Sequence, residues 1–348
     1  MRAHTRLLLG LGLALGALPV RAETWRTASG QPFDGKLSGV FGSIVAVSGR
    51  GGTALIPVGK LDDAGLARVA DFLDGPGKAP SPWSVSSERV AKGLRRKLQI
   101  MKDGKLAAFD PGARPEPVIY LVYFGAHWCP PCREFSPKLV AAYRRLKEIA
   151  PDSFELVFVS DDRSGDEQVA YARDVGMPWP ILRYSDVGSV PAIERWAGPG
   201  IPDLVVLTRS GDAILNSYVG AEYVGPESVL DAVEPLLLAM DGDSQACRRE
   251  LHRLSVLRHV RAAAGGSCNP KPYLIALDAS RYQTLEIKRV SALLSIDEHG
   301  RVTDAKIEPQ LPSVLEYQLE QDTRDWLFLP AVADGRPTAA RVNLPIQF

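Results

Sequence analysis

Two cysteines separated by only two residues are the side chains best suited to do chemistry in this sequence. Cys129 and Cys132 flank Pro130 and Pro131. At this spacing the second sulfur lies close enough to the first to form a disulfide and to resolve a mixed disulfide. The pair therefore predicts thiol–disulfide exchange, which requires neither a metal nor a cofactor.

The residues around the pair predict the elements that must position it. Residues 118–124 form a continuous apolar run, as expected for a strand buried on both faces. The apolar residues after the pair recur at helical spacing, at Phe135, Leu139, Ala142, Tyr143, Leu146 and Ile149. Cys129 thus ends a strand and Cys132 lies in the first turn of a helix. A helix N-terminus favours a thiolate, so we expect Cys129 to be exposed and its pKa to fall from about 8.5 toward neutrality.

Two other uses of the cysteine pair are open to the sequence. A zinc site needs two further ligands, and His252 and His259 lie in a distant segment on a predicted helix. The strand before the pair and the helix after it also differ from a zinc knuckle. A purely structural disulfide here closes almost no chain, so it would stabilise far less than the roughly 3 kcal/mol of a 15-residue loop. Redox chemistry is therefore favoured.

The stretch around the pair resembles the tryparedoxin and nucleoredoxin group of the thioredoxin fold. The matching stretches, in family order, are Tyr123 to Pro137 with its Trp-Cys-Pro-Pro-Cys motif, Phe154 to Asp162, Met177 to Trp179 and Gly200 to Leu207. The resemblance implies an α/β domain with a central mixed sheet flanked by helices, which we place at residues 85–243. Pro137 matches the kink of the family's active-site helix, and Pro202 matches its cis-proline.

The same resemblance implies roles for individual residues. Cys129 takes the role of attacking nucleophile and Cys132 that of resolving thiol, so the two form a redox-active disulfide. Trp128, Pro130, Pro131, Ile201 and Pro202 are expected to line the substrate surface, because the family docks substrate chains beside its cis-proline.

One position departs from thioredoxin itself. Tyr123 stands where thioredoxin has a buried carboxylate, six residues before the first cysteine. Proton removal from Cys132 must then rely on water or on another group, and Glu155 and Glu134 are candidates.

The N-terminal part of the chain predicts a signal peptide and a small β domain. Basic residues, an apolar run from Leu7 to Val20 and the small residue Ala22 are the order of a secretory signal, which we place at 1–22. Residues 23–75 contain short β-prone runs around a Gly-rich turn and resemble the small Sla-homology barrel, a relative of the Src-homology barrels. Residues 76–84 are rich in Pro and Gly and read as a linker.

The C-terminal segment, residues 244–348, predicts a β-β-α-β unit. Residues 291–307 read as two strands around an Asp-Glu-His-Gly turn, and residues 341–348 alternate as a half-buried strand. The series resembles the C-terminal domain of the energy transducer TonB. The long proline-rich arm of a transducer is not recognisable before it, so the resemblance implies a sheet edge that accepts a partner strand or peptide, or else a cap without a ligand.

The remaining cysteines, Cys247 and Cys268, could form a structural disulfide, since leftover cysteines of exported proteins usually pair. An unbroken helix from Cys247 to Ala264 would rise about 25 Å, and four residues can return only about 14 Å. Either that helix is broken, for example near Ser255, or no bond forms.

Composition excludes several classes of function. The 348 residues predict two or three domains, with ordinary globular proportions of 45% hydrophobic and 24% charged residues. Basic and acidic side chains number 41 each, so no excess charge favours nucleic acid or an anionic membrane. Removal of residues 1–22, with three arginines and no acidic residue, would leave 38 basic and 41 acidic side chains and a formal charge of −3. No membrane span is expected after that removal.

The sequence as a whole predicts an exported thiol–disulfide oxidoreductase that works as a reductase. We place it in the periplasm, where disulfides persist. Its partners would be protein thiols and disulfides, together with an upstream electron donor. The alternative is an envelope adaptor that senses redox state and binds proteins without turnover.

Overall fold

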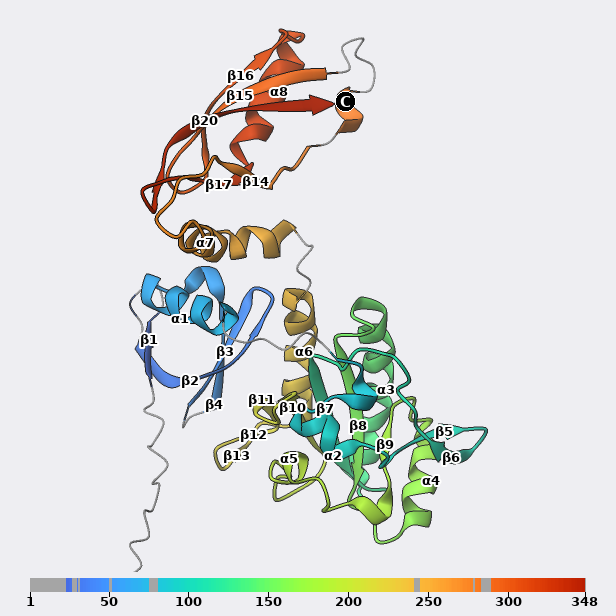
Figure 1. Cartoon of the computed structure of the whole chain (residues 1–348). Coiled ribbons are helices and arrows are strands. Elements are labelled where there is room, and N and C mark those ends of the chain that lie inside the picture. Colours follow the sequence, from blue (N-terminus) through green and yellow to red (C-terminus); the bar gives the residue numbers. More distant parts are fainter. Residues whose placement is uncertain are drawn as a thin grey trace, which may run out of the picture.

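The computed structural model describes residues 23–26, 30, 32–49, 52–74, 81–240, 245–277, 279–282 and 289–347. The signal peptide predicted at 1–22 and most of the predicted linker lie outside these residues. Figure 1 shows a central α/β domain, a small N-terminal sheet beside it and a C-terminal unit joined through helix α7. No helix in the described ranges is both long and apolar enough to cross a membrane.

The central domain is built on a seven-stranded mixed sheet of order β11-β10-β7-β8-β9-β5-β6. Its strands are β5 (Leu98–Lys102), β6 (Lys105–Ala108), β7 (Ile119–Gly125), β8 (Phe154–Ser160), β9 (Ile181–Leu182), β10 (Asp203–Thr208) and β11 (Ala213–Asn216). Strands β7, β8 and β9 run parallel, and the other neighbours are antiparallel. The predicted mixed sheet is confirmed.

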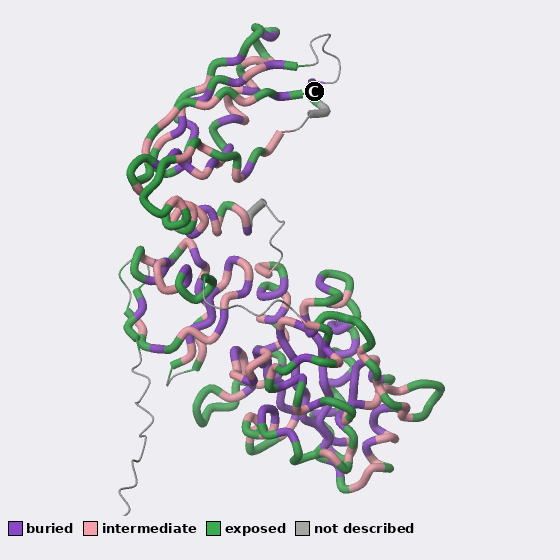
Figure 2. The backbone as a smooth tube through the Cα atoms, viewed as in Figure 1, coloured by how far each residue is buried: buried purple, intermediate pink, exposed green. Residues whose placement is uncertain are grey.

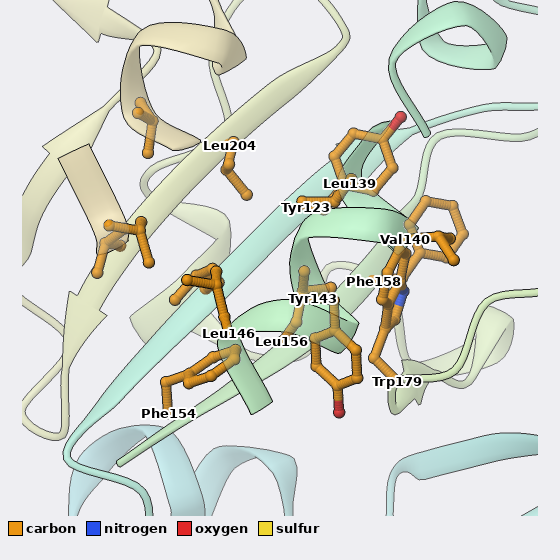
Figure 3. Packing of buried hydrophobic residues seen from close by; sticks show 14 of the residues in the cluster. Tyr123, Leu139, Val140, Tyr143, Leu146, Phe154, Leu156, Phe158, Trp179 and Leu204 are labelled. Carbon is orange, nitrogen blue, oxygen red and sulfur yellow. The ribbon is translucent and has the colours of Figure 1, made fainter. Parts of the chain in front are cut away.

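Alternate residues of β7 enter two separate cores, one on each face of the sheet. Ile119, Leu121 and Tyr123 pack under α3 (Pro130–Ile149), α4 (Gly165–Val175) and α6 (Pro226–Met240). Tyr120, Val122 and Phe124 pack under α2 (Arg89–Leu94) and α5 (Pro191–Glu194). Figure 3 shows the first core, and Figure 2 shows the buried strands at the centre of the sheet, where every residue of β7, β8 and β10 is buried. Burial on both faces explains why the sequence of β7 is apolar without alternation.

The start of the central domain corrects one predicted boundary. Residues 76–84 read as a linker, but Pro82 bridges to Pro115 and the Trp83 N–H donates to the Arg114 carbonyl at 2.9 Å. Trp83 is buried in the core under α2. The aromatic ring therefore belongs to the domain, and the boundary lies before residue 82.

The N-terminal unit is a four-stranded antiparallel sheet of order β1-β2-β3-β4 with one helix. Its elements are β1 (Glu23–Arg26), β2 (Pro32–Phe41), β3 (Ile44–Gly49), β4 (Gly52–Pro57) and α1 (Asp63–Asp74). The hairpin predicted around the Gly-rich turn is confirmed by the β3–β4 pairing. Within the described residues β1 and β4 do not pair with each other, but the Asp62 N–H donates to the Arg26 carbonyl at 3.2 Å, which joins the segment after β4 to the end of β1. The predicted barrel stays a prediction.

The N-terminal sheet is fused to the edge of the central domain. Phe41 and Ala46 enter the same core as Ile214 of β11 and Val233 of α6. The Ser43 N–H donates to the Ala239 carbonyl at 3.0 Å, at the end of α6. A shared apolar core resists relative motion, because separating the two units would return that apolar surface to water.

Helix α7 (Gln245–Ala262) joins the N-terminal unit to the C-terminal unit. Its basic side chains pair with the acidic residues of α1, in the pairs Arg253–Asp63, Arg258–Asp74 and Arg261–Asp71. Leu254 is buried in the N-terminal core. On the opposite side, the Nε2 atoms of His252 and His259 lie 2.8 Å and 3.0 Å from the carbonyl oxygens of Phe328 and Pro330. The domain boundary predicted at residue 244 therefore cuts off a helix that both units share.

The C-terminal unit contains a three-stranded antiparallel sheet of order β16-β15-β20. Its principal elements are β15 (Arg289–Ile296), β16 (Val302–Glu308), α8 (Ser313–Arg324) and β20 (Ala340–Gln347). The smaller ones are β14 (Lys271–Leu274), η4 (Ala279–Tyr282), β17 (Leu327–Leu329), β18 (Ala331–Ala333) and β19 (Arg336–Thr338). The predicted hairpin, helix and final strand are confirmed.

The structure decides between the two alternatives for Cys247 and Cys268. Helix α7 continues without a break through Ser255 to Ala262. Cys247 Sγ lies 3.5 Å from the Ala239 carbonyl oxygen, whereas Cys268 Sγ lies 3.4 Å from His259 Nε2. The proposed structural disulfide between them is therefore absent, because the rigid helix carries the two sulfurs apart.

Candidate active site

The cysteine pair lies at the N-terminus of α3, directly after β7, as predicted. Cys129 is the N-cap residue and forms a disulfide with Cys132, with the two Cα atoms 5.3 Å apart. The Cys132 backbone N–H donates to Cys129 Sγ at 3.2 Å. This N–H is one of the unpaired donors of the helix start, and it would stabilise a Cys129 thiolate after reduction.

The exposure of Cys129 differs from the prediction. In the disulfide form Cys129 is only 3% exposed and Cys132 is fully buried. Both cysteines belong to the apolar core under α3, which explains the difference. Pro130 and Pro131 are exposed, and so is Trp128, at 45%. A substrate would therefore meet an apolar rim before it reaches the sulfur.

A cis peptide bond between Ile201 and Pro202 faces the reactive sulfur, and Pro202 precedes β10 as predicted. The Ile201 carbonyl oxygen lies 3.7 Å from Cys129 Sγ. Ile201 is half-buried and Pro202 is buried. The structure thus brings all five predicted surface residues, three beside the cysteines and two on this loop, to one site.

A buried carboxylate fixes the loop before Cys129. Asp162 accepts from the His127 backbone N–H at 2.6 Å and from the Ser160 hydroxyl at 2.7 Å. Burial raises the pKa of Asp162, while these two hydrogen bonds oppose the rise. The Trp128 indole N–H donates to the Asp161 carbonyl at 3.1 Å. The end of β8 therefore holds the backbone and the indole ring in place.

Three hydroxyl groups occupy the space beneath the cysteines. Tyr123 Oη lies 2.9 Å from Ser136 Oγ and 3.4 Å from the Cys132 carbonyl oxygen. Ser136 Oγ lies 2.7 Å from Tyr171 Oη. Burial raises the pKa of both tyrosines above their ordinary value of 10.0, so both stay neutral. This hydroxyl cluster, Tyr123, Ser136 and Tyr171, replaces a titrating carboxylate with groups that cannot accept a proton at neutral pH.

One of the two suggested proton acceptors, Glu155, is not at the site. Glu155 pairs in register with Tyr120, five residues before Gly125, which places it about 16 Å along the strand from the active-site end of β7. It accepts instead from the Tyr143 hydroxyl at 2.7 Å. Glu134 is exposed to solvent on α3. The suggestion of Glu155 is therefore wrong, because strand register carries it to the opposite end of the sheet.

A tyrosine pair holds the cis-proline loop from outside, and the sequence did not single it out. Tyr218 and Tyr223 face each other on the hairpin of β12 (Tyr218–Val219) and β13 (Glu222–Tyr223), with ring centroids 4.9 Å apart. Tyr218 donates to the Gly200 carbonyl at 3.3 Å, and Tyr223 donates to the Pro202 carbonyl at 2.7 Å. The only local signal is a short turn between two tyrosines, which does not reveal where the hairpin docks.

Asp203 holds the same loop from inside the domain. It is fully buried directly after Pro202, and its Oδ2 accepts from the Gly198 backbone N–H at 2.9 Å. Burial raises its pKa. The loop that faces Cys129 is therefore fixed at Gly198, Gly200 and Pro202.

Comparisons with known proteins agree with this site. Residues 117–213 match the family model described as thioredoxin-like. Nucleoredoxin of Bos taurus is 30% identical over 281 residues, which cover 78% of this chain and 54% of that protein. Nucleoredoxin of Mus musculus is 45% identical over 145 residues, which cover 40% of this chain and 31% of that protein. The chain thus spans about half or less of the length of these relatives.

Solved structures of the same group are also similar. Thioredoxin from Wuchereria bancrofti is 26% identical, covers 40% of this chain and 96% of its own, and has a TM-score of 0.31. Tryparedoxin I from Leishmania major is 27% identical, covers 43% of this chain and 92% of its own, and has a TM-score of 0.30. The family match establishes a thioredoxin-like domain at residues 117–213, in a chain that is similar to nucleoredoxins.

Proposed function

We propose that this chain is a thiol–disulfide oxidoreductase that reduces protein disulfides. The observation that carries the proposal is the Cys129–Cys132 disulfide at the start of α3, with Cys129 Sγ 3.7 Å from the carbonyl of Ile201 beside a cis-proline. This arrangement gives a sulfur nucleophile, a resolving thiol and a backbone edge for a substrate chain in one place. The thioredoxin-like family match supports the same chemistry.

The reducing cycle transfers two electrons. The Cys129 thiolate attacks one sulfur of a substrate disulfide, the substrate S–S bond breaks, and one substrate thiolate leaves with the electron pair. Cys132 then attacks Cys129 Sγ, which breaks the mixed disulfide, releases the second substrate thiolate and forms the Cys129–Cys132 disulfide. An upstream electron donor returns two electrons and restores the dithiol.

The hydroxyl cluster does not accept the proton of Cys132. Because Tyr123 and Tyr171 stay neutral, neither takes the proton when Cys132 becomes a nucleophile. The departing substrate thiolate is a base released at the site, and an ordinary cysteine has a pKa near 8.5. We therefore expect the proton of Cys132 to pass to that thiolate or to water.

Reduction of insulin with a dithiol as electron donor tests the proposal. We expect steady turnover by the wild type, none by Cys129→Ser, and accumulation of a mixed disulfide by Cys132→Ser. Cys268→Ser is the matched control, because it removes a thiol of the C-terminal unit, outside the site. No turnover by the wild type against insulin and other disulfides would contradict the proposal.

The C-terminal sheet favours a second candidate, an adaptor that binds proteins and senses redox state through the cysteine pair. Among the described residues, β16 and β20 each pair only with β15, so each leaves one edge without a ladder partner. Such edges can add a strand from another chain. A wild-type protein that captures a partner in both redox states, with no turnover, would support the adaptor over the enzyme.

We also propose export to the periplasm, on the pattern of residues 1–22 alone. The N-terminal sequence of the protein recovered from the periplasm of an expressing bacterium tests this. A first residue of Glu23 is expected, whereas recovery from the cytosol with Met1 in place would contradict export.

A further inference from the structure

A large cleft lies beside the shared core, with walls from both the N-terminal sheet and the central domain. Its volume is about 1040 Å³, at the upper end of the range for pockets that bind drug-sized ligands. Phe72 of α1 and Thr53 of β4 line the N-terminal side, and Trp196, Tyr218 and Val219 line the other. Figure 1 shows β12 and β13 projecting on this side of the central domain, near β4 and β11.

The cleft is continuous with the redox site through one short loop. Gly198 and Pro199 line the cleft, and Ile201, three residues beyond Gly198, faces Cys129 Sγ. Three residues of extended chain span at most about 10 Å, so the cleft wall begins within that distance of the loop position that faces the sulfur. A polypeptide laid along this loop reaches the cleft after about three residues.

The same tyrosine forms part of both sites. Tyr218 lines the cleft and donates to the Gly200 carbonyl at 3.3 Å. A Cβ atom on Gly198 would overlap the Tyr218 ring and would lie 3.0 Å from Asp203 Oδ2. The glycine therefore permits close packing between the cleft wall and the loop that faces Cys129. This contact fixes the position of the cleft relative to the sulfur.

The lining of the cleft has the chemistry of a site for an extended polypeptide. Strand β11 lines the cleft and pairs only with β10 among the described strands, so its outer edge has no ladder partner there. One main-chain group of β11, the Ala213 carbonyl, accepts from the Thr53 hydroxyl of β4 at 3.1 Å, which leaves the rest of this edge to a bound chain. Exposed apolar side chains flank that edge, with Phe72 at 50% and Val219 at 44% exposure. A backbone edge with apolar pockets on either side binds extended chains through main-chain hydrogen bonds and alternate side chains. Arg195 and Asp212, also in the lining, pair with each other at 3.4 Å.

We propose that this cleft binds the polypeptide segment next to the reactive cysteine of a protein substrate. The proposal rests on the proposed function and extends it, because it makes the N-terminal sheet part of the substrate site. A small disulfide reacts at Cys129 without reaching Gly198. The cleft should therefore contribute to catalysis on proteins and contribute nothing to the reaction with small disulfides.

Charged substitutions on the two walls test the proposal with matched controls. Val219→Glu and Phe72→Glu place a carboxylate on each side of the cleft. Val187→Glu and Leu73→Glu change exposed apolar residues that do not line it. The two readouts are kcat/KM for insulin and the rate at which the reduced enzyme reacts with the small disulfide 5,5′-dithiobis(2-nitrobenzoic acid).

We expect the cleft variants to lose about fivefold to tenfold in kcat/KM for insulin, as substitutions of residues that anchor a bound chain do. Their rate with the small disulfide should stay within twofold of the wild type, and the controls should match the wild type in both assays. Equal losses with both disulfides would overturn the proposal, since the cleft would then act on the cysteines and not on a substrate chain. No loss with either disulfide would overturn it as well.

A cross-linking measurement places the substrate directly. Cys132→Ser is combined with a photoreactive benzoylphenylalanine in place of Val219, and the mixed disulfide with insulin is irradiated. A cross-link to the insulin chain is expected from position 219 and not from position 187. A mixed disulfide without a cross-link from position 219 would overturn the proposal that the cleft binds the substrate chain, but it would leave the proposed function intact. Failure to form any mixed disulfide would instead count against the proposed function.

Discussion

The Tyr223 hydroxyl donates to the Pro202 carbonyl oxygen over 2.7 Å and so ties the β12–β13 hairpin to the cis-proline beside Cys129. Burial is the main cause that raises the pKa of Tyr223 to about 12, so the phenol stays a donor throughout the neutral range. Tyr218 makes the equivalent contact to Gly200. A hairpin outside the central sheet therefore controls the geometry of the substrate edge.

Removal of one phenolic oxygen should weaken catalysis without unfolding the domain. Tyr223→Phe deletes the hydrogen bond to Pro202, which is worth about 1 kcal/mol, and we expect kcat/KM for insulin to fall by about fivefold. Tyr317→Phe is the control, because Tyr317 is exposed on α8. A Tyr223→Phe enzyme with wild-type kcat/KM would show that the loop keeps its position without the tyrosine.

A methyl group on Gly198 should disturb both the loop and the cleft. A Cβ atom at this position overlaps the Tyr218 ring, so Gly198→Ala is expected to lower the free energy of unfolding by about 1–3 kcal/mol. Urea denaturation measures the change. Gly165→Ala is the matched control, since its Cβ would meet Tyr184 only at 3.7 Å, an ordinary contact. Equal stability of the two variants would contradict the packing described for Tyr218.

The hydroxyl cluster should affect stability more than proton transfer. Tyr123→Phe removes the hydrogen bond to Ser136, which costs about 1 kcal/mol of unfolding free energy. The pH profile of insulin reduction between pH 6 and 9 should not change, because the raised pKa of Tyr123 keeps the phenol neutral across that range. A profile displaced by more than about half a unit would identify Tyr123 as a proton acceptor after all.

Acid should weaken the contact between α7 and the C-terminal unit. Burial lowers the pKa of His252 below 6.5, and the nearby positive charge of Arg301 lowers it further. The hydrogen bond to the Phe328 carbonyl and the negative charge of Asp297 oppose this shift. The imidazole of His252 therefore binds a proton more readily in the unfolded chain than in the folded one. The contribution of neutral His252 to the free energy of unfolding is complete above pH 6.5 and is lost as the pH falls toward the folded-state pKa.

Comparison with a variant isolates this contribution. The free energy of unfolding should fall less between pH 7.5 and 5.5 for His252→Gln than for the wild type, as measured by urea denaturation. His299→Gln, at an exposed histidine, should behave like the wild type. Identical pH dependence in all three proteins would rule out His252 as the titrating group.

The sequence by itself determined the elements that carry the reactive sulfurs. The apolar run of β7, the helical spacing of apolar residues in α3 and the position of Cys129 between them are all local patterns. The two elements could therefore be predicted, together with where β7 ends and α3 begins. The position of Pro202 also followed from a local motif. The C-terminal hairpin and the final strand could be predicted in the same way, because a strand with one buried face alternates between apolar and polar residues.

Tertiary structure alone decided which surfaces meet. Strand register placed Glu155 away from Cys132, and the unbroken helix α7 kept Cys247 and Cys268 apart. The tyrosine hairpin docks on residues 18 and 21 positions away in the chain. The cleft beside it depends on contacts between segments much farther apart, as in the Thr53–Ala213 hydrogen bond across 160 positions. Local periodicity fixes which face of an element is apolar, but the partner of that face is set by the packing of the whole chain.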